Sequence, residues 1–141
     1  MTDGTIGGLR VYTVKDSETW VEETDRHLTD FTGSVWDALF YGVLGCPEPE
    51  PYIEGVSIDD QVEHDRITFQ QSIREYPMLG RIWDTYADAS YQPEEVNPLR
   101  DECLKVRAVT TNPRALEALA KLLFACDEAL KEAQGLFMAS D

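Results

Sequence analysis

The sequence predicts a mainly α fold. We expect one compact domain over residues 1–141, a bundle of five to six helices with at most a small two-stranded β element near 9–14 and 136–140. Three observations favour this class: a strongly amphipathic segment at 112–135, an almost wholly apolar segment at 35–44, and cap residues and prolines that divide the chain between 57 and 98. A chain of 141 residues is long enough to bury a core within one domain.

The first two elements follow from patterning. Residues 9–14 (LRVYTV) alternate and are rich in β-branched and aromatic residues, which is typical of a short strand. Asp16 or Ser17 then opens a predicted helix that ends at Thr32–Gly33. Five of its residues fall on one face at helical spacing: Trp20, Thr24, His27, Leu28 and Phe31.

A second helix is predicted over 35–44 (VWDALFYGVL), with a buried strand as the alternative, because periodicity alone does not separate the two. Ser34 and Asp37 have the spacing of a capping box, and Gly45 stops the element. The loop Cys46–Gly55 follows. Its three prolines at alternate positions favour a stiff, extended backbone.

Two further helices are expected before residue 89. Ser57 caps one that turns Val62, Phe69 and Ile73 inward and ends before Pro77. Pro77 starts the other, and residues 89–92 form a turn after it. The apolar patch of the second helix consists of Leu79, Ile82, Trp83 and Tyr86.

The next helix begins at Pro93 or at Pro98, both of which suit a first helical position. Either start leaves one apolar stripe of Val96, Leu99, Cys103 and Val106. The clearest helix runs from its cap Asn112 to a stop at Gly135, and 136–140 is a strand that we pair with 9–14. The stripe predicted for this helix is Leu116, Leu119, Ala120, Leu123, Cys126, Leu130 and Ala133.

The charge of the chain is concentrated in one third of its length. Of the net −15, residues 16–65 contribute −13, with fourteen acidic residues against the single base Arg26. Such a field repels phosphate backbones and attracts basic proteins, so we expect a basic protein partner and no nucleic acid. Solvation, or adaptation to salt in a halophile-type or structural domain, explains the same charge equally well.

Several classes of site are disfavoured. Three widely spaced cysteines without a C-x-x-C indicate buried thiols in a reducing compartment, and no apolar stretch is long enough for a membrane span, so a cytoplasmic protein is expected. The chain has no G-x-S-x-G, no phosphate-binding glycine loop between a strand and a helix, and only two histidines. We therefore predict no catalytic residue and no cofactor.

A metal site is the competing hypothesis. Asp60 and His64 lie four residues apart, as do Glu23 and His27, so two facing helices could offer four ligands for a divalent ion. A metal-dependent enzyme or metal-binding helical protein would result. The same spacing is common in exposed helix pairs, and no Glu-x-x-His or His-Glu-x-x-His occurs.

The preferred hypothesis is a non-enzymatic acidic binding protein that engages a basic partner. A cytoplasmic inhibitor, such as an immunity protein that blocks a nuclease toxin, fits the small, acidic, helical character of the chain. The predicted binding face combines the acids of the proline-spaced loop and of the following helix with one aromatic residue. Its members are Glu48, Glu50, Tyr52, Glu54, Asp59, Asp60 and Glu63.

Overall fold

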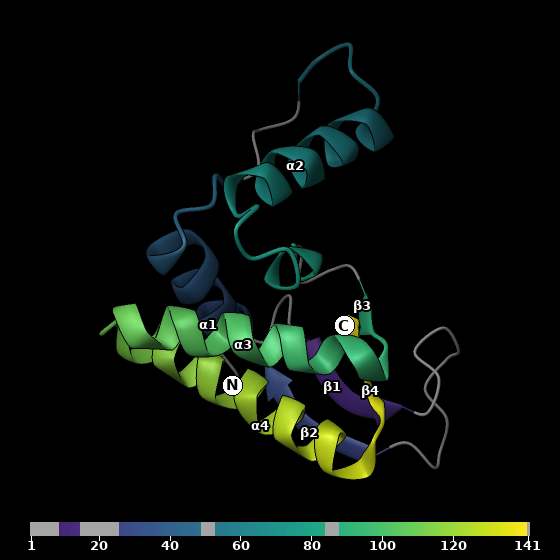
Figure 1. Ribbon diagram of the computed structural model, residues 1–141. Helices are drawn as coiled ribbons and strands as arrows, with labels where there is room; N and C mark the ends of the chain where they lie inside the picture. Colours follow the sequence, from purple (N-terminus) through teal and green to yellow (C-terminus); the bar gives the residue numbers. More distant parts are fainter. Residues whose placement is uncertain (1–8, 15–25, 49–52, 84–87, 141) are drawn as a thin grey trace, which may run out of the picture.

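The protein has a four-stranded antiparallel sheet packed against helices (Figure 1). The computed structural model describes residues 9–14, 26–48, 53–83 and 88–140. Within these residues there are four α-helices, α1 to α4, together with one π-helical and one 3-10 segment. The predicted bundle of five to six helices with at most two strands is therefore wrong, and an α+β arrangement replaces it.

The strand order is β2-β1-β4-β3. The central strands β1 (Leu9–Val14) and β4 (Gly135–Ser140) are the two that the sequence predicts, and they pair antiparallel, with Val11 opposite Met138. β2 (Arg26–Phe31) adds to β1 and β3 (Ala89–Tyr91) adds to β4. The alternation that identifies β1 arises because Leu9 and Val11 face the core.

β2 corrects the helix predicted to run as far as Phe31. Residues 15–25 lie outside the described residues, but 26–31 form a strand. Val11 lies opposite Thr29 while Tyr12 lies opposite His27, so Leu28 is an extra residue in a β-bulge, and it packs against the core. The bulge interrupts the period of two, and that interruption is what resembled helical spacing in the sequence.

β3 corrects the turn predicted at 89–92. Ala89 and Tyr91 point into the core and Ser90 faces away, but three residues are too few to show an alternation. β4 approaches this strand closely. A Cβ at Gly135 would overlap the carbonyl oxygen of Tyr91, so Gly135 permits the strand contact and does not stop the preceding helix.

The apolar segment 35–44 is helical, as predicted. It comprises α1 (Gly33–Asp37) and the π-helix η1 (Ala38–Val43). Thr32, not Ser34, is the N-cap, and no side chain caps this end, so the predicted capping box does not form. Gly45 has a φ of 70°, the left-handed conformation that ends a helix.

The middle of the chain holds one long helix and one short turn. α2 (Ile58–Ser72) is capped by Ser57, whose Oγ accepts the Asp60 N–H, as predicted. The helix predicted from Pro77 is only the 3-10 turn η2 (Leu79–Arg81), and residues 84–87 with Tyr86 lie outside the described residues. The buried carboxylate of Glu102 accepts the N–H groups of Met78 and Leu79, which holds this turn.

The last two helices pack on each other and on the sheet. α3 (Pro93–Val109) starts at the first of its two candidate prolines, and its predicted stripe of Val96, Leu99, Cys103 and Val106 is buried. α4 (Pro113–Glu132) has the predicted Asn112 cap and ends at the left-handed Ala133. Its buried face is rotated from the predicted one: Ala120, Leu130 and Ala133 are exposed, whereas Ala115, Ala118, Leu122 and Ala129 are buried.

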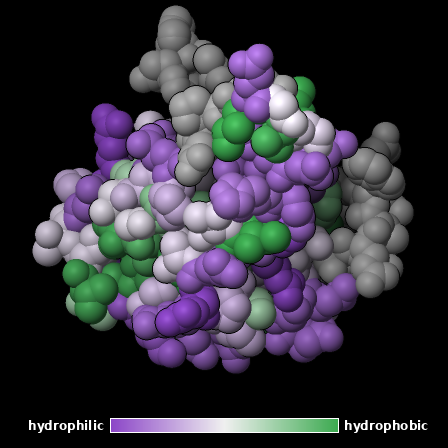
Figure 2. All heavy atoms as spheres, turned by 90° about the horizontal axis from the view of Figure 1, so that it is seen from above, coloured by the Kyte–Doolittle hydropathy of each residue, from purple (hydrophilic) through white to green (hydrophobic). Residues whose placement is uncertain are grey.

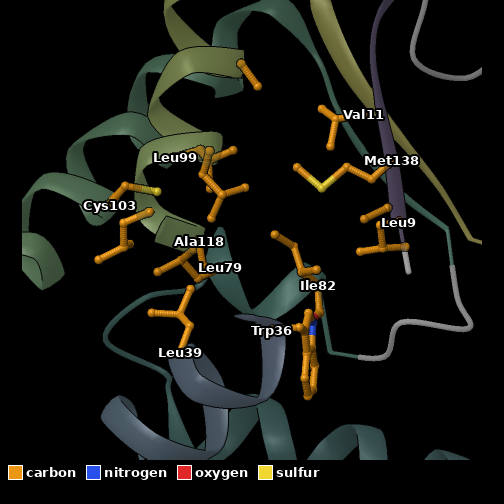
Figure 3. Packing of buried hydrophobic residues seen from close by; sticks show 14 of the residues in the cluster. Leu9, Val11, Trp36, Leu39, Leu79, Ile82, Leu99, Cys103, Ala118 and Met138 are labelled. Atoms are coloured by element: carbon orange, nitrogen blue, oxygen red, sulfur yellow. The ribbon is translucent and has the colours of Figure 1, made fainter. Parts of the chain in front are cut away.

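The core fills the space between the sheet and the helices (Figure 3). Leu9, Val11 and Met138 project from the sheet towards Leu99 and Ala118. At the opposite end Trp36 closes the cluster and donates its Nε1–H to the carbonyl of Ile82 at 3.0 Å.

Among the described helices, none combines the length and apolarity that crossing a bilayer requires.

Candidate protein-interaction site

α2 lies away from the sheet and the α3–α4 pair, and its C-terminal half packs on the rest of the fold (Figure 1). Phe69 and Ile73 are each 3% exposed. The centroid of the Phe69 ring lies 5.8 Å from the ring centroid of Trp36 and 5.5 Å from that of Phe40. Gln70 adds a hydrogen bond from Nε2 to the carbonyl of Gly80. In the first two turns Gln61 is buried and accepts the Ile53 N–H, whereas Ile58 and Val62 are exposed.

Those first turns expose apolar side chains. Ile58 is 69% exposed and Val62 is 45% exposed, so the prediction that Val62 turns inward is wrong. Ile67 and Ile53 are each 42% exposed. The backbone N–H of Ile53 donates to Gln61 Oε1 at 2.9 Å, which holds this residue beside the helix. In the view from above, hydrophobic side chains interrupt a mostly hydrophilic surface (Figure 2).

Three of the predicted acids lie on the same turns. Asp59, Asp60 and Glu63 are exposed; at 100° per residue Asp60 and Glu63 fall on the side of α2 away from the Phe69 stripe, and Asp59 borders that stripe. Arg66 forms a bidentate ion pair with Glu63 and holds its pKa below the usual range. Within the described part of the chain, the side-chain carboxylates of Asp59 and Asp60 have no hydrogen-bonding or ionic partner.

The remaining predicted acids lie before the helix. Glu54 is exposed in the turn that precedes Ser57. Glu48 is exposed close to Asp37, whose pKa is raised by burial and then by the charge of Glu48. Glu50 and Tyr52 belong to 49–52, outside the described residues. The structure therefore brings Glu54, Asp59, Asp60 and Glu63 to one end of α2 and places Glu48 with Asp37.

Arginines compensate only part of this charge. Arg66 is occupied by Glu63. Arg81 pairs with Glu95 of α3, donates to the carbonyl of Ser90 and lies over the Tyr91 ring. It does not neutralise an acid of residues 16–65. Arg74 lines an open hollow of about 410 Å³ at the foot of α2 together with Leu44 and residues 71–76.

The candidate metal ligands that the structure describes lie on separate elements. Asp60 and His64 lie on α2, whereas His27 lies on β2, where its Nε2 is 2.8 Å from Asp30 Oδ1. Glu23 lies outside the described residues. Across the described ranges there is no group of three or more His, Cys, Asp or Glu side chains arranged to hold a metal ion.

Two of the thiols are unsuited to nucleophilic chemistry. Burial raises the pKa of Cys103 well above its usual range and that of Cys126 to about 12, and both residues are fully buried in the core. A protonated, enclosed thiol is a structural residue, since the thiolate is the reactive form.

The apolar members of the site, Ile53, Ile58, Val62 and Ile67, are absent from the predicted binding face. A signal for part of this set exists in the sequence, because Ile58, Val62 and Ile67 alternate with acids along the segment that Ser57 caps. At 100° per residue Ile67 falls on the opposite side of the helix from Ile58 and Val62, so the apolar residues do not share a single face that one core contact could bury. No family model, curated protein or solved structure matches this chain.

Proposed function

We propose that this chain is a non-enzymatic binding protein that engages a basic protein partner through the N-terminal half of α2. One observation carries the proposal. Of the seven large hydrophobic side chains that are exposed among the described residues, four lie between residues 53 and 67, in the same stretch as the acids of the predicted face. An apolar patch rimmed by charge is the usual composition of a recognition site.

The two components have different roles. Carboxylates steer a cationic surface towards the site and raise the association rate, and this effect weakens with salt. Ile58 and Val62 then supply apolar area whose burial stabilises the complex. Inhibition of a basic nuclease, as by an immunity protein, is one function of this kind. The three free cysteines suit a reducing, cytoplasmic location.

The test is a capture experiment with matched charge variants. Immobilised wild-type chain and the variant Asp59→Asn/Asp60→Asn/Glu63→Gln are compared on lysate of the source organism, with mass spectrometry of retained proteins. The control Glu75→Gln/Glu94→Gln/Asp101→Asn removes the same charge elsewhere on the surface. We expect a basic protein on the wild type and the control at about 0.1 M salt.

The triple variant on α2 should retain about tenfold less of that protein, and about 0.5 M salt should release it from all three. Equal retention by the two triple variants would show that charge on α2 has no special part in binding. Retention of acidic or neutral proteins alone would remove the basic partner from the proposal.

A further inference from the structure

One line of side chains on α2 runs out of the core into solvent. Positions 58, 62, 69 and 73 fall on one helical face. Its C-terminal members, Phe69 and Ile73, are buried against the body, whereas its N-terminal members, Ile58 and Val62, are largely exposed. The fold thus covers the C-terminal pair of this line of apolar side chains and leaves the N-terminal pair exposed.

A carboxylate lies within this stripe. Asp65 is three residues after Val62 and four before Phe69, which places it on the same face between them. It is half-buried, and among the described residues it has no hydrogen-bonding or ionic partner. Asp59 borders the stripe on one side. An occupant of this face meets apolar side chains and unpaired negative charge together.

These features select one occupant. Packing of a helix against an apolar i, i+4 stripe requires an apolar stripe on the incoming helix, and the flanking carboxylates require Lys or Arg beside it. A second copy of this chain is disfavoured, because two surfaces of like charge would meet at Asp59 and Asp65. From this geometry we infer that the Ile58–Val62 face of α2 receives a basic amphipathic helix of the partner. The inference rests on the proposed function and specifies its mode.

The test uses the 141-residue chain and two fluorescein-labelled peptides of about 18 residues made of Leu and Lys. In the first peptide the leucines recur at i, i+3, i+4 and i+7 and form one helical face. The second has the same composition with the leucines distributed around the helix, so charge is equal and only the apolar face is lost. Binding is measured by fluorescence anisotropy at about 0.15 M salt.

We expect the wild-type chain to prefer the amphipathic peptide about tenfold, a ratio that corresponds to burial of a few methyl groups. Ile58→Ser/Val62→Ser should abolish the preference without lowering Tm, because both side chains are exposed. The control Val109→Ser removes a 77% exposed side chain at the end of α3, and this variant should retain the preference for the amphipathic peptide. Asp65→Asn should weaken binding of both peptides.

Equal affinity of the wild-type chain for the two peptides, or binding of neither, would overturn the helical occupant. So would a preference that survives Ile58→Ser/Val62→Ser. The proposed function is judged separately, by Asp59→Asn/Asp60→Asn/Glu63→Gln: if this variant binds both peptides as tightly as the wild-type chain does, carboxylate steering fails whichever peptide is preferred.

Discussion

Glu95 forms a partly buried ion pair that connects two elements of the fold. Its carboxylate accepts hydrogen bonds from the Arg81 guanidinium and from the N–H of Gln92, at 2.9 Å each, and so links η2 to the start of α3. Arg81 is the larger cause and Gln92 the smaller cause of a Glu95 pKa lowered to about 2. A lowered pKa in the folded state stabilises the fold above the ordinary value of 4.5, and the stabilisation is lost as pH falls from there to about 2.

Replacement of Glu95 by Gln keeps an acceptor for Gln92 and removes the charge. At pH 7 we expect the free energy of unfolding to fall by about 1–2 kcal/mol, a value reduced for the partial exposure of the side chain. Urea unfolding of both proteins at pH 7, 4.5 and 2 measures the difference. It should shrink towards zero at the lowest pH, because the carboxyl is then nearly fully protonated in the unfolded chain and about half protonated in the folded protein, so little of the linkage remains. A difference that is constant with pH would assign the loss to packing instead of charge.

Gly135 is a second residue at which a substitution should change stability. A methyl group there would overlap the Tyr91 carbonyl, so Gly135→Ala must separate β3 from β4. We expect a loss of about 1–3 kcal/mol in urea unfolding, as for overpacked cores. Gly42→Ala is the matched control, because its new Cβ would have no neighbour closer than 3.9 Å. Similar stability of the two variants would show that β4 moves to accept the methyl group.

At the scale of elements, local signals identify helix starts better than strands. Ser57 and Asn112 cap where the sequence predicts, because a cap acts over three residues. β2 and β3 form because β1 and β4 offer unpaired ladder groups to them, and their partners are more than ten residues away in sequence. The buried side of α4 is decided likewise by contacts with α3 and the sheet, which the helical period does not contain.

The same distinction applies to the candidate site. Charge counting alone finds Asp59, Asp60 and Glu63, since exposed acids need no partner to be recognised. Ile58 and Val62 share their helical face with Phe69, and the sequence predicts Val62 and Phe69 to face inward. Only the position of α2 against Trp36 and Phe40 shows that the body covers this face from Phe69 onwards and leaves the earlier turns exposed. The apolar half of the site is thus a property of the assembled fold.

The packing of Phe69 against Trp36 and Phe40 has a measurable consequence for α2. Phe69→Ala should cost about 3–5 kcal/mol and release the helix from Trp36 and Phe40. In amide hydrogen exchange of the wild-type protein, the first turns of α2 should exchange faster than α4. In Phe69→Ala, the whole of α2 should exchange as fast as those first turns do in the wild type. Phe124→Ala removes a 46% exposed ring from α4 and serves as the control. Equal loss of protection in α2 and α4 would show that the two helices unfold as one unit.

At the scale of the whole molecule, the net charge of −15 has two possible origins that respond to salt in opposite ways. In a salt-adapted domain, acids serve the folded state, so low salt should unfold the chain and molar salt should restore both folding and binding. In an interaction protein, the acids serve the encounter with the partner. Folding then needs no more salt than is required to screen self-repulsion, and binding weakens as salt rises.

We expect the behaviour of an interaction protein. In one NaCl series from about 0.02 to about 0.5 M, thermal unfolding should remain cooperative at the lowest concentration and Tm should rise by a few degrees, because screening reduces repulsion among the acids. Over the same series the affinity for the Leu–Lys amphipathic peptide should fall at least tenfold, since the screened carboxylates of α2 no longer steer it. If Tm rises with salt while affinity falls, the acids of α2 destabilise the fold and contribute to binding. If both quantities rise together with salt, the charge is an adaptation to solvent, and α2 loses its role as a docking element for a basic partner.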